Sequence, residues 1–172
     1  MPSVHNVHQR KLLREVTEVG ALIDSLASSG DRLWPAWRWP AQRLDGPLAV
    51  GARGGHGPIR YTVAEYARGA RVVYSFTAPR GLIGRHGFEV VARDSGATIL
   101  RHTLAGTTEG TMRLAWPLVW RPMHDALIED ALDTAEAALG RKPIAQRQLP
   151  TWVRVLRTIA RRLPSLRRAT SS

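Results

Sequence analysis

The clearest pattern in the chain is an amphipathic stretch from Trp116 to Leu139. Its apolar residues recur at spacings of three and four, the period of one helical face. They are Trp116, Val119, Trp120, Met123, Leu127, Ala131, Ala135 and Ala138. Charged residues take the opposite side, where we expect water to solvate them: Arg121, Asp125, Glu129, Asp133 and Glu136. The pattern predicts one long helix on which a sheet closes.

Local signals mark the ends of this helix. Gly140 suits the left-handed position after a helix, and the basic residues that follow it complement the negative helix end. Pro117 suits a first turn, whereas Pro122 removes an interior N–H group. We therefore expect a kink or a late helix start at Pro122.

The first 40 residues predict a strand, a helix and an irregular loop. Residues 3–13 form the strand, and Val16–Leu26 the helix, ended by Ser28-Ser29-Gly30-Asp31. Three tryptophans follow, punctuated by prolines that exclude a regular helix: Trp34, Trp37 and Trp39. They either gate the mouth of a cavity or plug one end of the sheet, and we favour the plug.

From Trp39 to Thr108 the chain predicts short strands separated by turns, as in an antiparallel meander. The turn signals are Asp45-Gly46-Pro47, Gly54-Gly55-His56-Gly57, Arg68-Gly69-Ala70, Pro79-Arg80-Gly81 and Asp94-Ser95-Gly96. The whole order is strand, helical stretch, about six strands and long helix. This order predicts an α+β fold in which the helix packs across the apolar face of the sheet.

One hairpin can be set in register from its turn. A three-residue turn at residues 94–96 pairs Arg93 with Ala97, Val90 with Leu100, Phe88 with His102 and His86 with Leu104. One face then holds Phe88, Val90, Leu100 and Leu104 with His86 and His102, and the other holds Arg85, Glu89, Arg93 and Arg101. Two registers stay open for Tyr61–Ala67 against Val72–Ala78, because residues 68–70 allow a two- or a three-residue loop.

Charge divides the chain in two. All 14 Asp and Glu residues lie before residue 141, whereas residues 141–172 carry 9 of the 25 Lys and Arg residues. We therefore expect a domain at 1–140 and a basic tail at 141–172.

The absence of cysteine excludes disulfides, thiolate metal sites and cysteine catalysis. The start has no apolar signal region and no run approaches a membrane span, so we expect a cytoplasmic protein, peripheral to the membrane if the tail binds lipid.

Residues 3–140 resemble the START-like, helix-grip superfamily, also called SRPBCC or Bet v 1-like, and more narrowly its polyketide cyclase/dehydrase-like members. The resemblance rests on Arg32–Trp37, on the G-x-x-x-x-G-x-R passage Gly46–Arg53, on V-x-E-Y within Ile59–Tyr66, and on Asp94–Thr98 with the closing helix. It implies a curved antiparallel sheet of about six or seven strands that grips the long helix. It also implies a cavity for an apolar or aromatic small molecule, without a fixed catalytic set.

The candidate ligand-binding residues are the aromatic and histidine side chains expected on the inner face. They are Tyr61, Tyr74, Phe76, His86, Phe88, His102, Trp116, Trp120 and His124. Ordinary core packing is the competing interpretation of each. His56 lies in a glycine-rich turn and is expected in solvent, whereas His5 and His8 point to opposite faces of their strand. Without H-x-x-x-H or paired carboxylates, we expect neither a metal nor a cofactor.

The leading functional hypothesis is binding or transport of an apolar or aromatic small molecule, lipid- or polyketide-like, in this cavity. The alternative is a cyclase/dehydratase-type enzyme. It would use His102 or His124 as general base, with a tyrosine such as Tyr74 polarising a carbonyl. Whether the chain is an enzyme stays open at this point.

The tail carries a separate prediction. Pro150-Thr151 opens a helix that Pro164 stops, with Trp152, Leu156, Ile159, Leu163 and Leu166 at spacings of four and three and with Arg154, Arg157, Arg161 and Arg162 between them. Residues 150–168 therefore suit an anionic membrane surface or a protein partner. The third alternative is that the tail docks on its own domain or stays mobile. Nucleic acid is disfavoured, because the body supplies no basic face.

Overall fold

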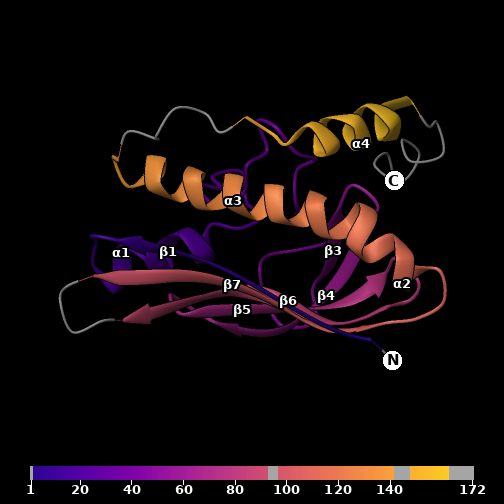
Figure 1. The fold of residues 1–172 in the computed structure, drawn as a ribbon. Helices are drawn as coiled ribbons and strands as arrows, with labels where there is room; N and C mark the ends of the chain where they lie inside the picture. The colour runs from indigo at the N-terminus through magenta and orange to yellow at the C-terminus, as the bar shows by residue number, and fades with distance from the viewer. Residues whose placement is uncertain (1, 93–96, 142–147, 163–172) are drawn as a thin grey trace.

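The computed structural model describes residues 2–92, 97–141 and 148–162. They form a seven-stranded antiparallel sheet with a long helical segment across one face (Figure 1). The strand order is β1-β7-β6-β5-β4-β3-β2, so the first and last strands in the sequence are neighbours. The predicted α+β helix-grip architecture is confirmed. The elements are β1 Ser3–Leu12, α1 Val16–Asp24, β2 Arg43–Leu44, β3 Arg53–His56, β4 Ile59–Ala67, β5 Arg71–Ala78, β6 Leu82–Ala92, β7 Thr98–Thr108, α2 Met112–Ala115, the π-helical turn η1 Trp116–Trp120, α3 Arg121–Ala138 and α4 Thr151–Arg162.

The β6–β7 hairpin has the register that its turn predicts. The observed pairs include Val90 with Leu100, Phe88 with His102 and His86 with Leu104. The expected pair of residues 93 and 97 is not tested, because residue 93 lies outside the described residues. The inner face is buried as expected, and on the outer face the Arg101 guanidinium donates to Glu89. Alternation along two paired strands was therefore sufficient to orient this part of the sheet.

The β4–β5 hairpin settles the register that the sequence left open. Ala67 pairs with Arg71 across a three-residue loop, but the pairing shifts by one residue between Val63 and Glu65. Beyond this bulge Val63 pairs with Tyr74. The shift keeps Val63 and Tyr74 on the buried face despite the loop. The register thus depends on an irregularity inside the strand, which loop length alone does not reveal.

The closing helix spans 27 residues, Met112–Ala138, as α2, η1 and α3 in succession. The expected disturbance at Pro122 takes the form of the π-helical turn, with Pro122 in the first turn of α3. Pro122 has no N–H group for the carbonyl of Leu118, four residues earlier. That carbonyl instead accepts a hydrogen bond of 2.6 Å from the indole Nε1 of Trp152 in α4. The proline therefore creates an attachment point for the tail helix.

The C-terminal end of α3 follows the sequence prediction. Gly140 has φ of +81°, and the N–H of Arg141 donates to the Glu136 carbonyl at 3.0 Å. The Gly140 N–H bonds to the Ala137 carbonyl, also at 3.0 Å. This pair of bonds is the Schellman arrangement that glycine permits.

The expectation that the charged side of this helix faces water holds for Arg121, whose side chain is 59% exposed, but is wrong for the residues nearer the end of α3. Strand β1 covers those residues, and the Glu136 side chain is 9% exposed. Arg10 of β1 forms ion pairs with Glu129, Asp133 and Glu136. The helix pattern showed which residues share a side, but the partners that cover them come from a strand more than 100 residues earlier.

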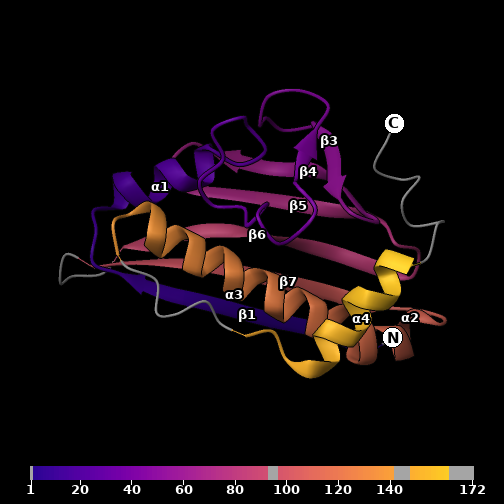
Figure 2. The ribbon, with the colours of Figure 1, turned by 90° about the horizontal axis from the view of Figure 1, so that it is seen from above.

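Helix α1 covers the same face of the sheet as α3 and is fastened to the β4–β5 loop (Figure 2). Asp24 Oδ1 accepts hydrogen bonds from the Tyr66 hydroxyl at 2.9 Å and from the Gly69 N–H at 2.8 Å. A Cβ added at Gly20 would lie 2.1 Å from the Gly69 carbonyl oxygen. The bare backbone of Gly20 therefore permits this close approach.

Buried side chains form two clusters. The larger joins α1, the inner face of the sheet and α3, around residues such as Ile23, Leu100 and Leu132. The smaller joins Leu104 and Trp116 with neighbours at the start of the closing helix. Aromatic and histidine side chains occupy the region between these clusters, and the candidate site lies there.

Helix α4 packs on the body of the protein, close to the start of α3 (Figures 1 and 2). Val153 is buried, and the Arg157 guanidinium lies 4.4 Å over the Trp39 ring. Docking of the tail on its own domain is thus observed for residues 151–162, whereas the predicted continuation beyond Arg162 lies outside the described residues. No helix in the described ranges combines the length and the apolar character needed to cross a membrane.

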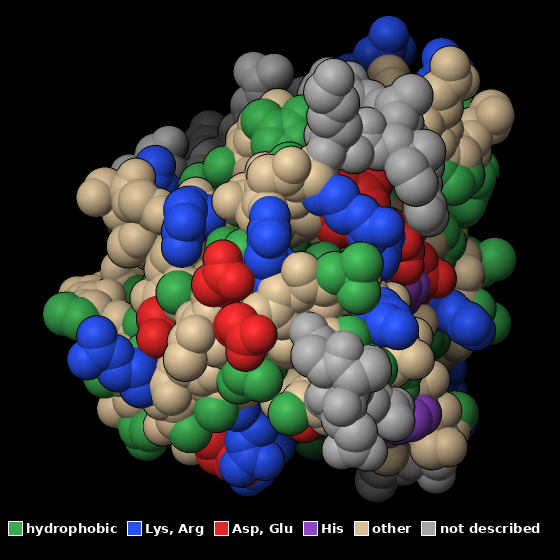
Figure 3. All heavy atoms as spheres, turned by 90° about the vertical axis from the view of Figure 1, so that its left-hand side faces the viewer, with side chains coloured by type: hydrophobic (Ala, Val, Ile, Leu, Met, Phe, Trp, Pro, Cys, Tyr) green, Lys and Arg blue, Asp and Glu red, His purple; other side chains and the backbone are tan. Residues whose placement is uncertain are grey.

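At the end of the molecule where α3 stops, the surface carries acidic and basic side chains side by side (Figure 3). Apolar side chains appear there only as small separate groups between the charges. Among the described residues visible in this view, this end therefore shows no broad apolar surface.

Candidate functional site

A cavity of about 560 Å³ lies between the two core clusters, with the sheet on one side and the closing helix and α4 on the other. Its wall contains eight of the nine predicted ligand-binding residues: Tyr74, Phe76, His86, Phe88, His102, Trp116, Trp120 and His124. Tyr61 is the exception, because it lies behind the wall and packs on the Tyr74 ring with centroids 4.6 Å apart. The predicted residues thus converge on one space from strands β5, β6 and β7 and from the closing helix.

Histidine rings form a continuous row along this wall. His86 Nδ1 lies 3.4 Å from His102 Nε2, and the rings of His102 and His124 are 5.0 Å apart. His8 follows at 6.0 Å from His124, on the β1 side. Phe76 stacks on His86 at 4.5 Å, so the imidazoles also contribute flat apolar faces.

Burial keeps the wall histidines in their neutral form. It lowers the pKa of His86 and of His102 well below the usual value, and repulsion between neighbouring imidazoles adds to the effect. Burial also lowers the pKa of His124, although Asp125 partly offsets it. Burial raises the pKa of the Tyr74 hydroxyl. The histidine and tyrosine side chains of the wall are therefore uncharged near neutral pH.

Several polar atoms of the wall lack hydrogen-bond partners among the described residues. They are the Tyr74 hydroxyl, His86 Nε2, His102 Nδ1 and both ring nitrogens of His124. Buried polar atoms are usually paired, because an unpaired one costs about 1–3 kcal/mol. These atoms are the natural contacts for polar groups of a bound molecule.

His56 also faces the cavity, which corrects the expectation that it lies in solvent. Its ring packs on Trp34 with centroids 4.6 Å apart, and Nδ1 lies 3.3 Å from the Tyr61 hydroxyl. Burial lowers the pKa of His56 to about 3. Pairing of β3 with β4 turns the glycine-rich segment inward, and the tryptophan loop then covers it.

The tryptophan loop forms part of the wall, so it does more than plug the end of the sheet. Trp34 and Trp39 are buried and line the cavity, whereas Trp37 is exposed. Trp39 Nε1 donates to Asp130 of α3 at 2.7 Å, and Arg38 approaches both oxygens of the same carboxylate at 3.2 Å. Asp130 therefore fastens the loop to the closing helix.

Helix α4 supplies the remaining side of the cavity. Leu156, Arg157 and Ala160 line it, and the Arg157 guanidinium donates to the Arg38 carbonyl. One wall of the site is thus part of the tail that the charge pattern separated from the domain.

Comparison with solved structures shows the same arrangement elsewhere. A solution structure from Thermobifida fusca matches 80% of this chain and 97% of its own, with 17% identity and a TM-score of 0.59. The solution structure of CalU16 from Micromonospora echinospora matches 97% of this chain and 88% of its own, with 15% identity and a TM-score of 0.57. Ara h 8.0201, a Bet v 1 protein, matches 81% of this chain and 100% of its own, with 9% identity and a TM-score of 0.55.

The chain has the helix-grip fold. No protein-family model matches the sequence, and no curated protein matches it significantly. At these identities the neighbours establish the helix-grip fold alone, and its function must be argued from the site.

In this helix-grip domain a polar network joins β1 to the start of α3 beside the cavity. Asp125 Oδ1 accepts a hydrogen bond of 2.8 Å from Asn6 and lies 3.1 Å from His8 Nε2. His8 Nδ1 lies 2.9 Å from Glu129. The contact with Asp125 is the main cause that raises the pKa of His8, while burial opposes it. Burial also opposes the fall in the pKa of Asp125, which the contacts with His124, His8 and Asn6 cause.

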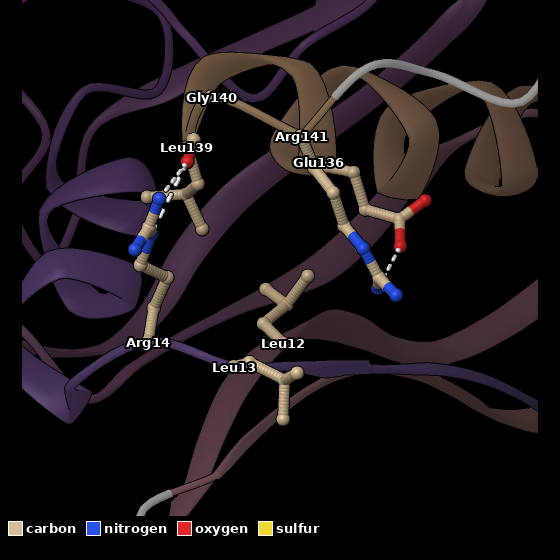
Figure 4. Close-up of a pocket in the computed structure, with 7 residues that line it drawn as sticks. All are labelled: Leu12, Leu13, Arg14, Glu136, Leu139, Gly140 and Arg141. Atoms are coloured by element: carbon tan, nitrogen blue, oxygen red, sulfur yellow. Dashed lines mark hydrogen bonds and ion pairs between the residues drawn. The ribbon is translucent and has the colours of Figure 1, made fainter.

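A second, smaller pocket of about 210 Å³ lies at the far end of α3 (Figure 4). Both of its arginines already have partners. Arg14 donates to the Leu139 carbonyl at 2.7 Å, and Arg141 to Glu136 at 3.0 Å. The charged groups of this pocket are therefore already paired, whereas the larger cavity has polar atoms without partners among the described residues.

Sequence reasoning missed three parts of the site: Asp130, the network around His8, and the wall supplied by α4. Asp130 lies between apolar positions of α3, which is a detectable signal for a buried carboxylate. The network around His8 had no local signal. For α4 the amphipathic pattern indicated an apolar side but not the cavity that it covers, because the partners of both parts are distant in the chain.

Proposed function

We propose that this protein binds and carries a small molecule with an apolar or aromatic body and at least one polar group. The observation that supports it is the cavity of about 560 Å³ at the gap between the two core clusters. This volume falls within the range of roughly 300–1,000 Å³ typical of small-molecule sites. Aromatic side chains such as Phe76 and Phe88 offer flat faces to rings or acyl chains.

The unpaired wall atoms narrow the class of ligand. Neutral His86 and His102 and the Tyr74 hydroxyl can each donate or accept a hydrogen bond, depending on tautomer or rotation. A hydroxyl or carbonyl group on the ligand would satisfy them, whereas a plain hydrocarbon would leave them unpaired. We therefore favour hydroxylated or carbonyl-bearing ligands, such as polyketide-like rings, over unsubstituted alkanes.

Adjacent residues of β6 provide the test. Leu82 lines the cavity, whereas Ile83 is 52% exposed on the outer face. Leu82→Trp fills the cavity and should weaken binding of the fluorescent probe 1-anilinonaphthalene-8-sulfonate at least about tenfold, the equivalent of about 1.4 kcal/mol. Ile83→Trp should leave binding unchanged. Equal affinity in both variants, or no probe uptake by the wild type, would contradict the carrier function.

The alternative, a cyclase/dehydratase-type enzyme, is supported by the row of histidines with Tyr74 at its side. The lowered pKa of His102 and His124 makes them weak bases, so the site favours orienting a ligand over abstracting a proton. In an assay on poly-β-ketone substrates, a double variant His102→Ala/His124→Ala should lose turnover if the enzyme hypothesis holds. Unchanged turnover would exclude these two bases.

The outer side of α4 supports contact with an anionic membrane surface. Trp152, Val155 and Ile159 are between 41% and 50% exposed, and Leu118 of η1 is 57% exposed beside Trp152. Exposed arginines accompany this stripe, among them Arg154. Apolar side chains flanked by arginine favour the interface of an anionic bilayer. The same helix lines the cavity, so we propose that the ligand is exchanged at a membrane by a peripheral protein.

Vesicle co-sedimentation tests this contact. The wild type should bind phosphatidylglycerol vesicles more strongly than phosphatidylcholine vesicles, with salt weakening the binding. Trp152→Ser/Ile159→Ser should reduce binding at least fivefold. Leu13→Ser/Val50→Ser, which removes two exposed apolar residues from other surfaces, should not. Equal sedimentation of the two variants would rule out α4 as the contact surface.

A further inference from the structure

Beside the cavity, three side chains from β1 and α3 bring metal-ligating atoms together. Within the described residues, one donor atom each from His8, His124 and Asp125 lies within 4.8 Å of the others. Asp125 Oδ1 is 3.1 Å from His8 Nε2 and 3.7 Å from His124 Nδ1. Ligands of a tetrahedral Zn²⁺ are about 3.3–3.5 Å apart, given bonds of about 2.0–2.2 Å. The three atoms therefore need only small shifts to share one ion.

The surroundings of His8 resemble the outer shell of a metal site. Its Nδ1 lies 2.9 Å from Glu129, and the other oxygen of Glu129 accepts a hydrogen bond from Arg10 at 3.1 Å. A carboxylate on one ring nitrogen fixes the tautomer and directs the lone pair of the other nitrogen outward. In this tautomer the His8 Nε2 lone pair faces an oxygen of Asp125. A proton on Nε2, as in the protonated ring that Asp125 stabilises, or a metal ion in place of that proton satisfies this pair of atoms.

The other two candidate ligands, Asp125 and His124, are also suited to bind a metal ion. The Asn6 amide donates to Asp125 Oδ1 at 2.8 Å, which orients that carboxylate. Neither ring nitrogen of His124 has a hydrogen-bond partner among the described residues, although the side chain is only 15% exposed. A buried imidazole without a partner is costly, and metal coordination would satisfy one of its nitrogens.

The charges around the three residues favour a cation. Asp125, Glu129 and Asp133 line this side of α3. Arg10 is already engaged by Glu129, Asp133 and Glu136, and Arg121 contacts Asp125 only from the exposed side, at 3.8 Å. Two imidazoles and a carboxylate suit borderline first-row ions such as Zn²⁺ and Co²⁺ rather than Mg²⁺ or Ca²⁺.

We propose that His8, His124 and Asp125 form a binding site for a divalent transition-metal ion of the zinc type, with Glu129 and Asn6 as outer-shell partners. Three protein ligands leave a further coordination position for water or another molecule. Because His124 also lines the cavity, the ion would lie at the cavity wall. This site does not depend on the identity of the cavity ligand or on whether the protein carries one.

The test is cobalt binding to chelator-treated full-length protein. Co²⁺ should give the visible d–d absorption of a low-coordinate nitrogen/oxygen site, and Zn²⁺ should displace it with one-to-one stoichiometry. His8→Gln and Asp125→Asn should abolish the absorption. Glu129→Gln should weaken Co²⁺ binding by about 10- to 100-fold, as loss of an outer-shell partner does. His5→Gln, on the exposed side of the same strand, is the matched control and should bind as the wild type does.

A second measurement covers the possibility that a variant fails to fold. In the unaltered protein, Zn²⁺ should shift the ring NMR signals of His8 and His124 but leave those of His5 in place. If the wild type gives neither the Co²⁺ band nor these shifts, the three side chains form an ion-pair network only and the proposal is overturned. A band that persists in both His8→Gln and Asp125→Asn would overturn it equally.

Discussion

Single residues set the electrostatics of this protein. Four histidines face the cavity from different elements, and burial lowers the pKa of each: His56, His86, His102 and His124. His8 has the opposite behaviour, because Asp125 stabilises its protonated form. Neighbouring histidines thus have pKa values shifted in opposite directions, down at the cavity wall and up beside Asp125.

The balance between these histidines predicts that acid destabilises the fold. Below pH 6.5 the histidines of the unfolded chain become protonated, whereas the four buried imidazoles of the folded chain stay neutral. The free energy of unfolding therefore falls as pH falls. Each histidine contributes about 1.4 kcal/mol per pH unit until its own folded pKa is reached. His8 opposes this: its stabilisation is present below pH 6.5 and is lost as pH rises through its raised pKa. The four buried histidines outweigh His8, so we expect lower stability in acid. Urea unfolding between pH 7.5 and 5 measures the net change in the free energy of unfolding.

His102→Asn isolates one contribution. The variant lacks a titratable ring at the most enclosed position of the row, where His102 is 1% exposed. The slope of unfolding free energy against pH below 6.5 should become shallower by about 1.4 kcal/mol per unit. A slope equal to that of the wild type would show that His102 takes up its proton in the folded state.

At the scale of elements, α1 packs so closely on the β4–β5 loop that Gly20 has no room for a side chain. Gly20→Ala should gain about 1 kcal/mol from helix propensity but force a Cβ into the Gly69 carbonyl. Overpacking of this kind costs about 1–3 kcal/mol, and here backbone on both sides resists relaxation. We therefore expect lower stability in urea, whereas Gly30→Ala, which meets only the Ser28 hydroxyl at 3.9 Å, should be close to neutral. Equal stability of the two variants would contradict the close contact.

The attachment of α4 to the closing helix can be tested in the same way. Trp152→Phe removes the hydrogen bond to the Leu118 carbonyl that Pro122 leaves free. A hydrogen bond of this kind contributes about 0.5–1.5 kcal/mol. Amide hydrogen exchange in α4 should accelerate by about fivefold, while exchange in β6 and β7 should not change. Unaltered exchange in α4 would mean that its other contacts are sufficient to hold it.

At the scale of the whole molecule, α4 closes a cavity that the sheet and α3 leave open. Val153 is 1% exposed on its inner side, whereas Val155 is 41% exposed on its outer side. Val153→Asp buries a charge unless α4 leaves the body, and undocking is the less costly outcome. The fluorescent probe should then enter the cavity at least threefold faster in stopped-flow measurements. Val155→Asp should leave the rate unchanged, and similar rates in both variants would show that α4 does not limit access.

Much of the fold was accessible from the sequence, because it depends on local regularities. The period of 3.6 residues located the closing helix, Gly140 marked its end, and alternation on either side of one turn set the β6–β7 register. Since the side chains of a strand alternate, that register also placed His86 and His102 on the wall. The β4–β5 bulge was not accessible, because packing decides where a strand absorbs an extra residue.

The sequence alone determined the order of elements, the inner face of the main hairpin and the aromatic character of the wall. Only the tertiary structure decided that His56 turns inward, that β1 covers the acidic side of the closing helix, and that α4 completes the cavity. The physical reason is distance along the chain. His8 and Asp125 are 117 residues apart, and Trp152 and Leu118 are 34 apart. A local pattern shows which side of an element is apolar, whereas the partner of a charged or exposed side is chosen when the elements pack together.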